Sequence, residues 1–186
     1  EINVETKSNP KIYVDNQLVE DAKLKSEIND DEINILLGIG GSGPTKRIPA
    51  KTFISFMNLA TQNYRCKFFL ATGKNVDEQK ILDEIISSKY KNKCYALDNL
   101  SLNEILPIIK FCNISVCNDS SFSHLSSGLG VETIVLMADT PLLYGNYSTK
   151  MHPVIPNGET IVTHDTLGKD KIDPTKIFKK FNEILN

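Results

Sequence analysis

The 186-residue chain is 40% hydrophobic and 24% charged, and its formal net charge is −2. This length suits a single domain with a buried core. The near-neutral charge gives no electrostatic basis for binding nucleic acid, and the sequence has no apolar run of the ~18 residues that indicates a membrane-spanning helix.

The four cysteines, Cys66, Cys94, Cys112 and Cys117, form no CxxC pair and have no histidine at the spacing of a zinc site. Three of them lie in or beside apolar, strand-like runs. We therefore expect buried free thiols in a reducing compartment, rather than disulfides or a bound metal.

The first part of the chain, residues 1–32, is interpreted as an interdomain linker with a leading strand and helix. It is polar as far as Pro10, and it then offers a short strand at residues 12–15 and a modest amphipathic helix at residues 16–28. Because the chain starts at Glu1 rather than Met, we expect it to be part of a longer protein.

Residues 33–186 alternate between strand and helix patterns. The expected strands cover residues 33–38, 66–71, 93–97, 114–117 and 132–137, with a short sixth strand at residues 160–162. The expected helices cover residues 50–62, 76–87 and 101–111, a small-residue helix that ends near Gly130, and a last helix that starts at Asp173-Pro174. This alternation predicts an α/β domain with a parallel sheet and helices on both faces. Such sheets bind ligands at the carboxyl ends of their strands.

A glycine-rich turn, residues 38–43, follows the first buried strand and matches GxGxxG. A dinucleotide site needs a helix directly after the glycines and an acidic residue about 20 positions later; Pro44 and Pro49 delay the helix, and the second strand ends without an acid. A P-loop needs Lys-Ser/Thr where Pro44-Thr45 stands. Accessible backbone N–H groups beside Lys46 and Arg47 instead indicate a phosphate site.

A second polar turn, residues 118–124, follows the fourth strand and leads into the small-residue helix. Asp119 and His124 invite a hydrolase interpretation, but GxSxG is absent. Unpaired N–H groups at the start of a helix favour an anion or a sugar hydroxyl. We expect Lys46 to lie opposite Asp119, Ser120 and Ser121 at the same edge of the sheet.

Three segments together resemble family nine glycosyltransferases, the heptosyltransferase family of lipopolysaccharide synthesis. Residues 40–49 resemble its Lys-Arg-Trp-Pro loop, residues 118–125 its Asn-Asp-Thr-Gly-x-x-His-Leu turn, and residues 139–147 its Thr-Asp-Pro…Gly-Pro-Tyr loop. Order and spacing agree over roughly residues 33–147.

The resemblance implies a Rossmann-like domain that is one half of the two-domain GT-B architecture. Residues 33–186 would then be the nucleotide-sugar-binding domain of an inverting, metal-independent glycosyltransferase about twice as long. Its partner would be an N-terminal acceptor-binding domain of the same protein, and this chain alone would be inactive. The donor would be a nucleotide-sugar, with ADP-heptose as the first candidate.

The resemblance also implies roles for residues of both turns. Lys46 and Asp119 would be the catalytic pair. The substrate-binding residues would be Gly41, Ser42, Gly43, Thr45, Arg47, Glu78, Ser120, Ser121 and His124. No metal and no cofactor are expected, because the nucleotide-sugar is a substrate. The acceptor would be a glycolipid or saccharide, and the location would be cytoplasmic, either free or peripheral to the inner membrane.

The chain departs from the family pattern at several positions. Ile48 replaces the usual tryptophan, and Ser120-Ser121 replaces Thr-Gly, so that Ser121 is strained if the turn needs a positive φ. An alternative function stays open: a non-catalytic Rossmann-like module that binds a phosphorylated metabolite or nucleotide.

Overall fold

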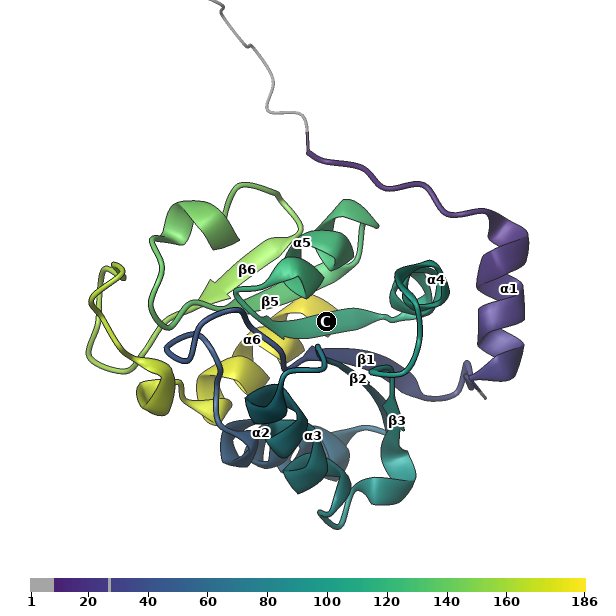
Figure 1. Ribbon diagram of the computed structural model, residues 1–186, viewed down its shortest axis with the longest axis horizontal. Helices are drawn as coiled ribbons and strands as arrows, with labels where there is room; N and C mark the ends of the chain where they lie inside the picture. Colours follow the sequence, from purple (N-terminus) through teal and green to yellow (C-terminus); the bar gives the residue numbers. More distant parts are fainter. Residues whose placement is uncertain (1–8, 27) are drawn as a thin grey trace, which may run out of the picture.

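The computed structural model describes residues 9–26 and 28–186 and contains a six-stranded parallel sheet in the order β3-β2-β1-β4-β5-β6 (Figure 1). The strands are β1 (Ile33–Gly38), β2 (Cys66–Ala71), β3 (Cys94–Ala96), β4 (Ile114–Asn118), β5 (Glu132–Leu136) and β6 (Met151–Val154). This arrangement confirms the predicted α/β, Rossmann-like fold.

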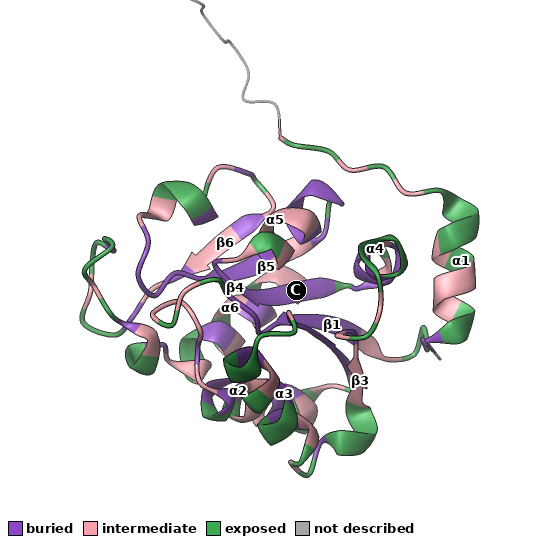
Figure 2. Ribbon diagram, in the orientation of Figure 1, coloured by how far each residue is buried: buried purple, intermediate pink, exposed green. Residues whose placement is uncertain are grey.

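The central strands are buried on both faces, as expected for a parallel sheet covered by helices (Figure 2). Consecutive residues Ile35, Leu36 and Leu37 of β1 are each 0% exposed. Their continuous apolar pattern is therefore the sequence signal of a strand that packs on two layers of helices.

Helices cover both faces of the sheet (Figure 1). One face packs against α2 (Ala50–Asn63), α3 (Val76–Ile86) and α6 (Pro174–Leu185); the other packs against α4 (Leu102–Phe111), α5 (Ser121–Gly128) and, over α4, α1 (Asn16–Lys25). Short 3₁₀ helices lie at η1 (Lys91–Lys93), η2 (Leu142–Gly145) and η3 (Lys169–Lys171).

The leading segment differs from the prediction in part. Residues 12–15 form no strand, and the helix ends at Lys25. The segment is nevertheless held against the domain, since the Ile12 N–H donates to the Gly128 carbonyl at 2.7 Å and Ala22 packs against the core on the α4 side. The predicted division at residue 32 stays a prediction, and residues 1–8 of the expected linker lie outside the described part.

The sixth strand was predicted in the wrong place. Residues 160–162 form no strand, and the sheet instead ends with β6, whose sequence contains His152-Pro153. A proline has no backbone N–H to donate to a neighbouring strand. An edge strand tolerates this, and β6 is such a strand because it pairs only with β5 in this sheet. Pro153 therefore hides the strand pattern and is itself compatible with an edge strand.

The strand order reverses between β1 and β4. The chain leaves β1 toward β2 and β3, then returns through α4 to pair β4 with the other side of β1. Such a switch point opens a crevice at the carboxyl ends of the two strands. The two polar turns predicted from the sequence follow these two strands. Since Gly38 pairs with Cys117 at the ends of β1 and β4, both turns start at the same edge of the sheet.

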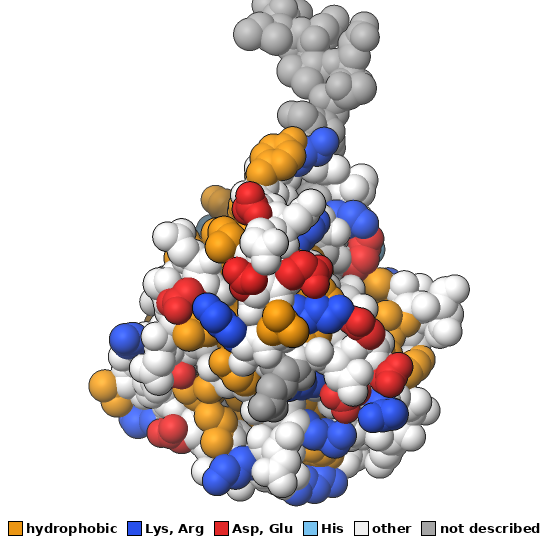
Figure 3. Space-filling model, turned by 90° about the vertical axis from the view of Figure 1, so that its right-hand side faces the viewer, with side chains coloured by type: hydrophobic (Ala, Val, Ile, Leu, Met, Phe, Trp, Pro, Cys, Tyr) orange, Lys and Arg blue, Asp and Glu red, His pale blue; other side chains and the backbone are white. Residues whose placement is uncertain are grey.

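The face around α1 carries positive and negative side chains in alternation, with scattered hydrophobic ones (Figure 3). No single sign of charge dominates this face.

Candidate functional site at the ends of β1 and β4

Lys46 and Asp119 meet at the switch point, as predicted from the sequence. The Lys46 Nζ lies 2.9 Å from the Asp119 Oδ2. The side chain of Asp119 is 5% exposed, whereas that of Lys46 is 27% exposed. The buried carboxylate therefore holds a partly accessible ammonium group at the mouth of the site.

Asp119 has a further partner that the sequence prediction missed. The Thr140 Oγ1 donates to the same Asp119 Oδ2 at 2.5 Å, and both residues are buried. Thr140 follows β5, the strand next to β4, so its position at the same edge of the sheet was a usable signal. The Asp119 Oδ2 therefore accepts two hydrogen bonds, one from an ammonium group and one from a hydroxyl group.

His124 lies on the other side of Asp119. Its Nε2 is 4.0 Å from the Asp119 Oδ1, and its Nδ1 is 2.8 Å from the Tyr147 hydroxyl. The two rings stack with centroids 5.6 Å apart. Burial raises the pKa of Tyr147, so its hydroxyl keeps its proton at neutral pH.

Glu78 is buried beneath the glycine-rich turn. Its Oε1 accepts the Gly41 N–H at 2.6 Å. A Cβ at Gly40 would lie 2.8 Å from Oε1, and one at Gly73 would lie 2.5 Å from Oε2. These glycines therefore allow the carboxylate to approach the backbone, and Glu78 fixes the conformation of the turn.

The same turn is held from β4 and from the chain after β6. The Asn118 Nδ2 donates to the Ile39 carbonyl at 2.8 Å and to the Gly40 carbonyl at 3.2 Å. The Lys169 Nζ donates to the Pro44 carbonyl at 3.0 Å. Contacts from two distant parts of the sequence thus stabilise the conformation of the turn.

Arg47 does not join Lys46. Its Nη1 lies 3.3 Å from both the Asn75 Oδ1 and the Asp77 Oδ2 at the start of α3. The expected pair of adjacent cations is therefore divided between two partners. Ser42 is exposed, and Gly43 and Thr45 are half-buried, beside Lys46 on the turn.

Ser120 and Ser121 begin α5. Ser120 is the N-cap, and its side chain makes no capping hydrogen bond; its Oγ is buried without a hydrogen-bond partner among the described residues. Ser121 is exposed and helical. Since Leu167 is the one non-glycine residue with a positive φ in residues 9–26 and 28–186, the expected strain at Ser121 is not present.

The cysteines of the chain lie in the described part and form no disulfide. All four cysteines are free thiols; Cys66, Cys112 and Cys117 are buried, and burial raises the pKa of Cys66 to about 11. Across residues 9–26 and 28–186, no three His, Cys, Asp or Glu side chains group in a way that would hold a metal ion. In the same residues, no helix is long and apolar enough to cross a membrane.

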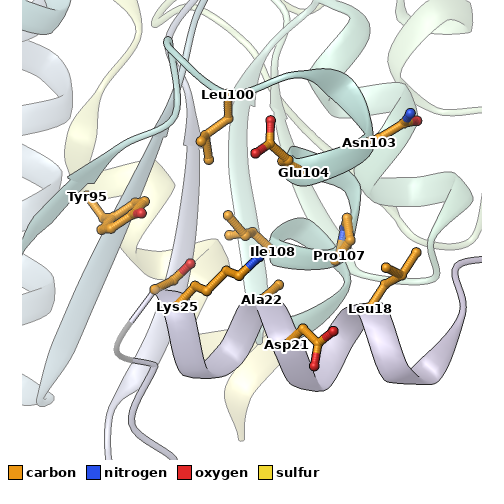
Figure 4. Close-up of a pocket in the computed structure, with 11 residues that line it drawn as sticks. Leu18, Asp21, Ala22, Lys25, Tyr95, Leu100, Asn103, Glu104, Pro107 and Ile108 are labelled. Atoms are coloured by element: carbon orange, nitrogen blue, oxygen red, sulfur yellow. The ribbon is translucent and has the colours of Figure 1, made fainter.

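A separate pocket lies between α1 and α4, away from both polar turns (Figure 4). Apolar side chains such as Leu18, Pro107 and Ile108 line it, with Lys25 and Glu104 at its polar side. Glu104 already accepts hydrogen bonds from Ser101 in a capping box. The pocket contains none of the residues predicted to bind substrate.

The fold and sequence match known glycosyltransferases. The chain is 24% identical over 159 residues to lipopolysaccharide heptosyltransferase 1 of Campylobacter coli, an alignment that spans 84% of this chain and 46% of that protein. It therefore covers about half the length of this relative.

Solved structures of heptosyltransferases have the same fold. The E. coli ADP-heptose lipopolysaccharide heptosyltransferase II is 19% identical with a TM-score of 0.74, over 95% of this chain and 53% of that one. The E. coli heptosyltransferase WaaC with ADP is 15% identical with a TM-score of 0.70, over 95% of this chain and 52% of that one. The family model of glycosyltransferase family 9 (heptosyltransferase) matches residues 2–178. The chain therefore belongs to glycosyltransferase family 9, the heptosyltransferase family.

Proposed function

We propose that this chain is the donor-binding half of an inverting, metal-independent glycosyltransferase that uses a nucleotide-sugar. The observation that carries the proposal is the Lys46–Asp119 pair, which holds a partly exposed cation at the switch point of the sheet. An ammonium group in this place is suited to the diphosphate of a nucleotide-sugar.

The diphosphate would bind between the glycine-rich turn and the start of α5. Lys46 supplies a positive charge, and Ser42, Gly43 and Thr45 supply backbone or hydroxyl donors from one side. The N-terminus of α5, with Ser120 and Ser121, supplies unpaired N–H groups from the other side. Glu78 would contact the ribose.

Departure of the nucleoside diphosphate builds up negative charge on its oxygens. A preorganised cation and a helix N-terminus stabilise such charge in the transition state, which is the role a metal ion fills in other enzymes. Asp119 would act by holding Lys46 in place. His124 would contact the sugar beside it.

Nucleotide binding tests this proposal. Calorimetry with ADP, UDP and GDP compares the nucleobases; because a solved relative contains ADP, ADP is the first candidate. We expect one of them to bind without added Mg²⁺ and equally well with EDTA present. Binding of none of the three, or binding that requires Mg²⁺, would contradict the proposal.

A non-catalytic module that binds a phosphorylated metabolite is the second candidate. It is favoured by one observation: the three buried acids of the described residues are all engaged within the chain. Asp119 accepts from Lys46 and Thr140, Glu78 from the Gly41 N–H, and Asp139 from the Leu167 N–H. The finding that this chain is encoded together with an acceptor-binding half that carries a free carboxylate would favour the enzyme over the non-catalytic module.

The acceptor and the location follow from the enzyme proposal. We infer a glycolipid or saccharide acceptor, bound by an N-terminal half, at or near the cytoplasmic surface of the inner membrane. Co-purification of this chain with that half, and sedimentation with membrane vesicles only when the half is present, would test both inferences together.

A further inference from the structure

Tyr147 is outside the predicted site, but it contacts a residue within it. His124 lies in the first turn of α5, and Tyr147 lies in the loop between η2 and β6. Their rings stack at an interplanar angle of 14°, and the Tyr147 hydroxyl is 2.8 Å from the His124 Nδ1. The pair borders an apolar groove that also contains Ile105 and Phe122.

This contact has a chemical consequence at the opposite nitrogen of the ring. A neutral imidazole carries one proton, and the hydrogen bond at one nitrogen determines which nitrogen holds it. If the tyrosine hydroxyl donates to Nδ1, the proton is on Nε2, which points toward the Asp119 Oδ1 at 4.0 Å. Burial favours the protonated tyrosine, which has this proton to donate.

We propose that Tyr147 is a positioning residue that holds His124 as its Nε2–H tautomer, so that His124 and Asp119 together recognise one sugar hydroxyl of the donor. The hydroxyl would accept from the His124 Nε2–H and donate to the Asp119 Oδ1. The gap of 4.0 Å between these two atoms is too long for a direct hydrogen bond, and it leaves an oxygen within reach of both.

The donor–acceptor pair also distinguishes a hydroxyl from a phosphate oxygen. A phosphate oxygen carries no proton to give to Oδ1 and is repelled by the carboxylate charge. The Asp119 Oδ2 already accepts from Lys46 and Thr140, so Oδ1 is the oxygen that remains for a ligand. The ligand part of this inference rests on the proposed function, whereas the assignment of the ring does not.

The ring assignment is tested by ¹⁵N NMR of the histidines at a pH where they are neutral. The chain has three histidines, His124, His152 and His164, which keeps the spectrum simple. We expect His124 as the Nε2–H tautomer in the wild type and about a fivefold fall in the ratio of Nε2–H to Nδ1–H in Tyr147→Phe, the equivalent of one ordinary hydrogen bond.

Tyr144→Phe is the matched control. Tyr144 lies, like Tyr147, between β5 and β6, and its ring is 6.3 Å from that of His164. Removal of the Tyr144 hydroxyl should therefore leave the NMR signals of His124 unaltered. A wild type that populates the Nδ1–H tautomer, or a Tyr147→Phe variant with the wild-type ratio, overturns the assignment. The wild-type spectrum alone decides the first point, even if the variant fails to fold.

Binding of ADP and of an ADP-sugar tests the ligand part. We expect Tyr147→Phe to bind ADP as the wild type does and to bind the ADP-sugar several-fold more weakly. An unchanged preference for the ADP-sugar overturns the recognition of a hydroxyl. If the wild type binds neither compound, the proposed function fails, while the NMR result still decides the tautomer.

Discussion

At the scale of single residues, Asp119 links three side chains of the site, Lys46, Thr140 and His124. One of its oxygens accepts from Lys46 and Thr140, and the other faces His124. A buried carboxylate that loses its donors is strongly destabilised. The position of the Lys46 ammonium and the burial of the Asp119 carboxylate therefore depend on each other.

Lys46→Ala tests whether the ammonium binds the diphosphate. Removal of a charge-assisted contact should weaken the binding of the preferred nucleoside diphosphate by about 1.5–3 kcal/mol, or about 10- to 150-fold in Kd. Calorimetry measures the change. Lys51→Ala is the control, because Lys51 is exposed on α2 and should be neutral. If the Lys46 variant and the wild type bound the nucleoside diphosphate with equal affinity, the assignment of Lys46 to the binding site would be wrong.

Residues that are adjacent in the sequence can contact different partners in the folded chain, and a sequence pattern does not reveal which partner each one contacts. The pattern of glycines followed by Lys46-Arg47 correctly placed Lys46 opposite Asp119. It wrongly grouped Arg47 with Lys46, because Arg47 instead pairs with Asp77 on α3. Thr140 and Tyr147 were missed as site residues although both lie in the loop of residues 139–147, because no sequence pattern shows that their hydroxyl groups reach Asp119 and His124.

At the scale of elements, the junction of β1 with β4 and α5 depends on close contact at Gly38. A Cβ on Gly38 would lie 2.6 Å from the Cys117 Sγ and 3.1 Å from the Phe122 Cβ. The absence of a side chain lets β1 approach the strand and helix that carry the second half of the site. Glycine at this position is thus required by packing.

Gly38→Ala should lower the free energy of unfolding by about 1–3 kcal/mol, the usual effect of overpacking a well-packed core. Gly43→Ala is the control, since its Cβ would meet nothing closer than the Thr45 Oγ1 at 3.8 Å. Urea denaturation of both variants and the wild type measures the difference. If Gly38→Ala were as stable as Gly43→Ala, the junction of β1 with β4 and α5 would be able to move and admit a methyl group.

The start of α6 depends on Asp173. Its carboxylate accepts from the Thr175 N–H at 2.8 Å and from the Thr175 hydroxyl at 2.7 Å. These bonds, the Thr175 hydroxyl first, lower the pKa of Asp173 from its ordinary value of 3.8. A lowered pKa in the folded state means that the stabilisation is complete above pH 3.8 and is lost as the pH falls through the folded pKa.

Asp173→Ala should therefore lower the free energy of unfolding by about 1 kcal/mol at pH 7, as for the loss of an N-cap. The difference from the wild type should shrink in acid, below pH 3.8. Urea denaturation at both pH values measures it. Asp165→Ala, at an exposed loop position, should have little effect at either pH. A difference that persists unchanged in acid would mean that the carboxylate charge is not the cause.

Elements with strong periodicity were predictable, and weakly patterned ones were not. The continuous apolar runs of β1, β2 and β4 and the capped helices α4 and α6 were placed to within a few residues. The short strand β6 was missed because His152 and Pro153 interrupt its pattern, whereas Ile161, which looked like part of a strand, is 71% exposed. Local pattern does not report which short segment reaches the edge of the sheet.

At the scale of the whole molecule, strand order brings the site together. The strand order places β1 and β4 side by side, although β1 ends at Gly38 and β4 begins only at Ile114. The glycine-rich turn and the start of α5 therefore face each other because the strand order reverses between β1 and β4, although the two segments are far apart in the sequence. Insertions into the surface loops far from this edge should leave the site intact.

The three buried acids of the described chain are engaged, which bears on catalysis. A general base must lie within hydrogen-bond reach of the acceptor hydroxyl and be free to take its proton. Glu78 and Asp139 already accept hydrogen bonds from Gly41 and Leu167. Asp119 accepts from Lys46 and Thr140 on one oxygen, and its other oxygen is the one proposed above to bind a donor hydroxyl. We therefore expect this chain to bind the donor without transferring the sugar.

The purified chain, incubated with an ADP-sugar and a saccharide acceptor, should release no ADP above the rate of the Lys46→Ala variant, although calorimetry shows donor binding. Addition of an acceptor-binding half that carries a carboxylate base should start transfer, because the base then reaches the acceptor hydroxyl while Lys46 stabilises the departing diphosphate. Sugar transfer by the chain alone would contradict this expectation and would mean that one of the engaged acids changes partners when the donor binds.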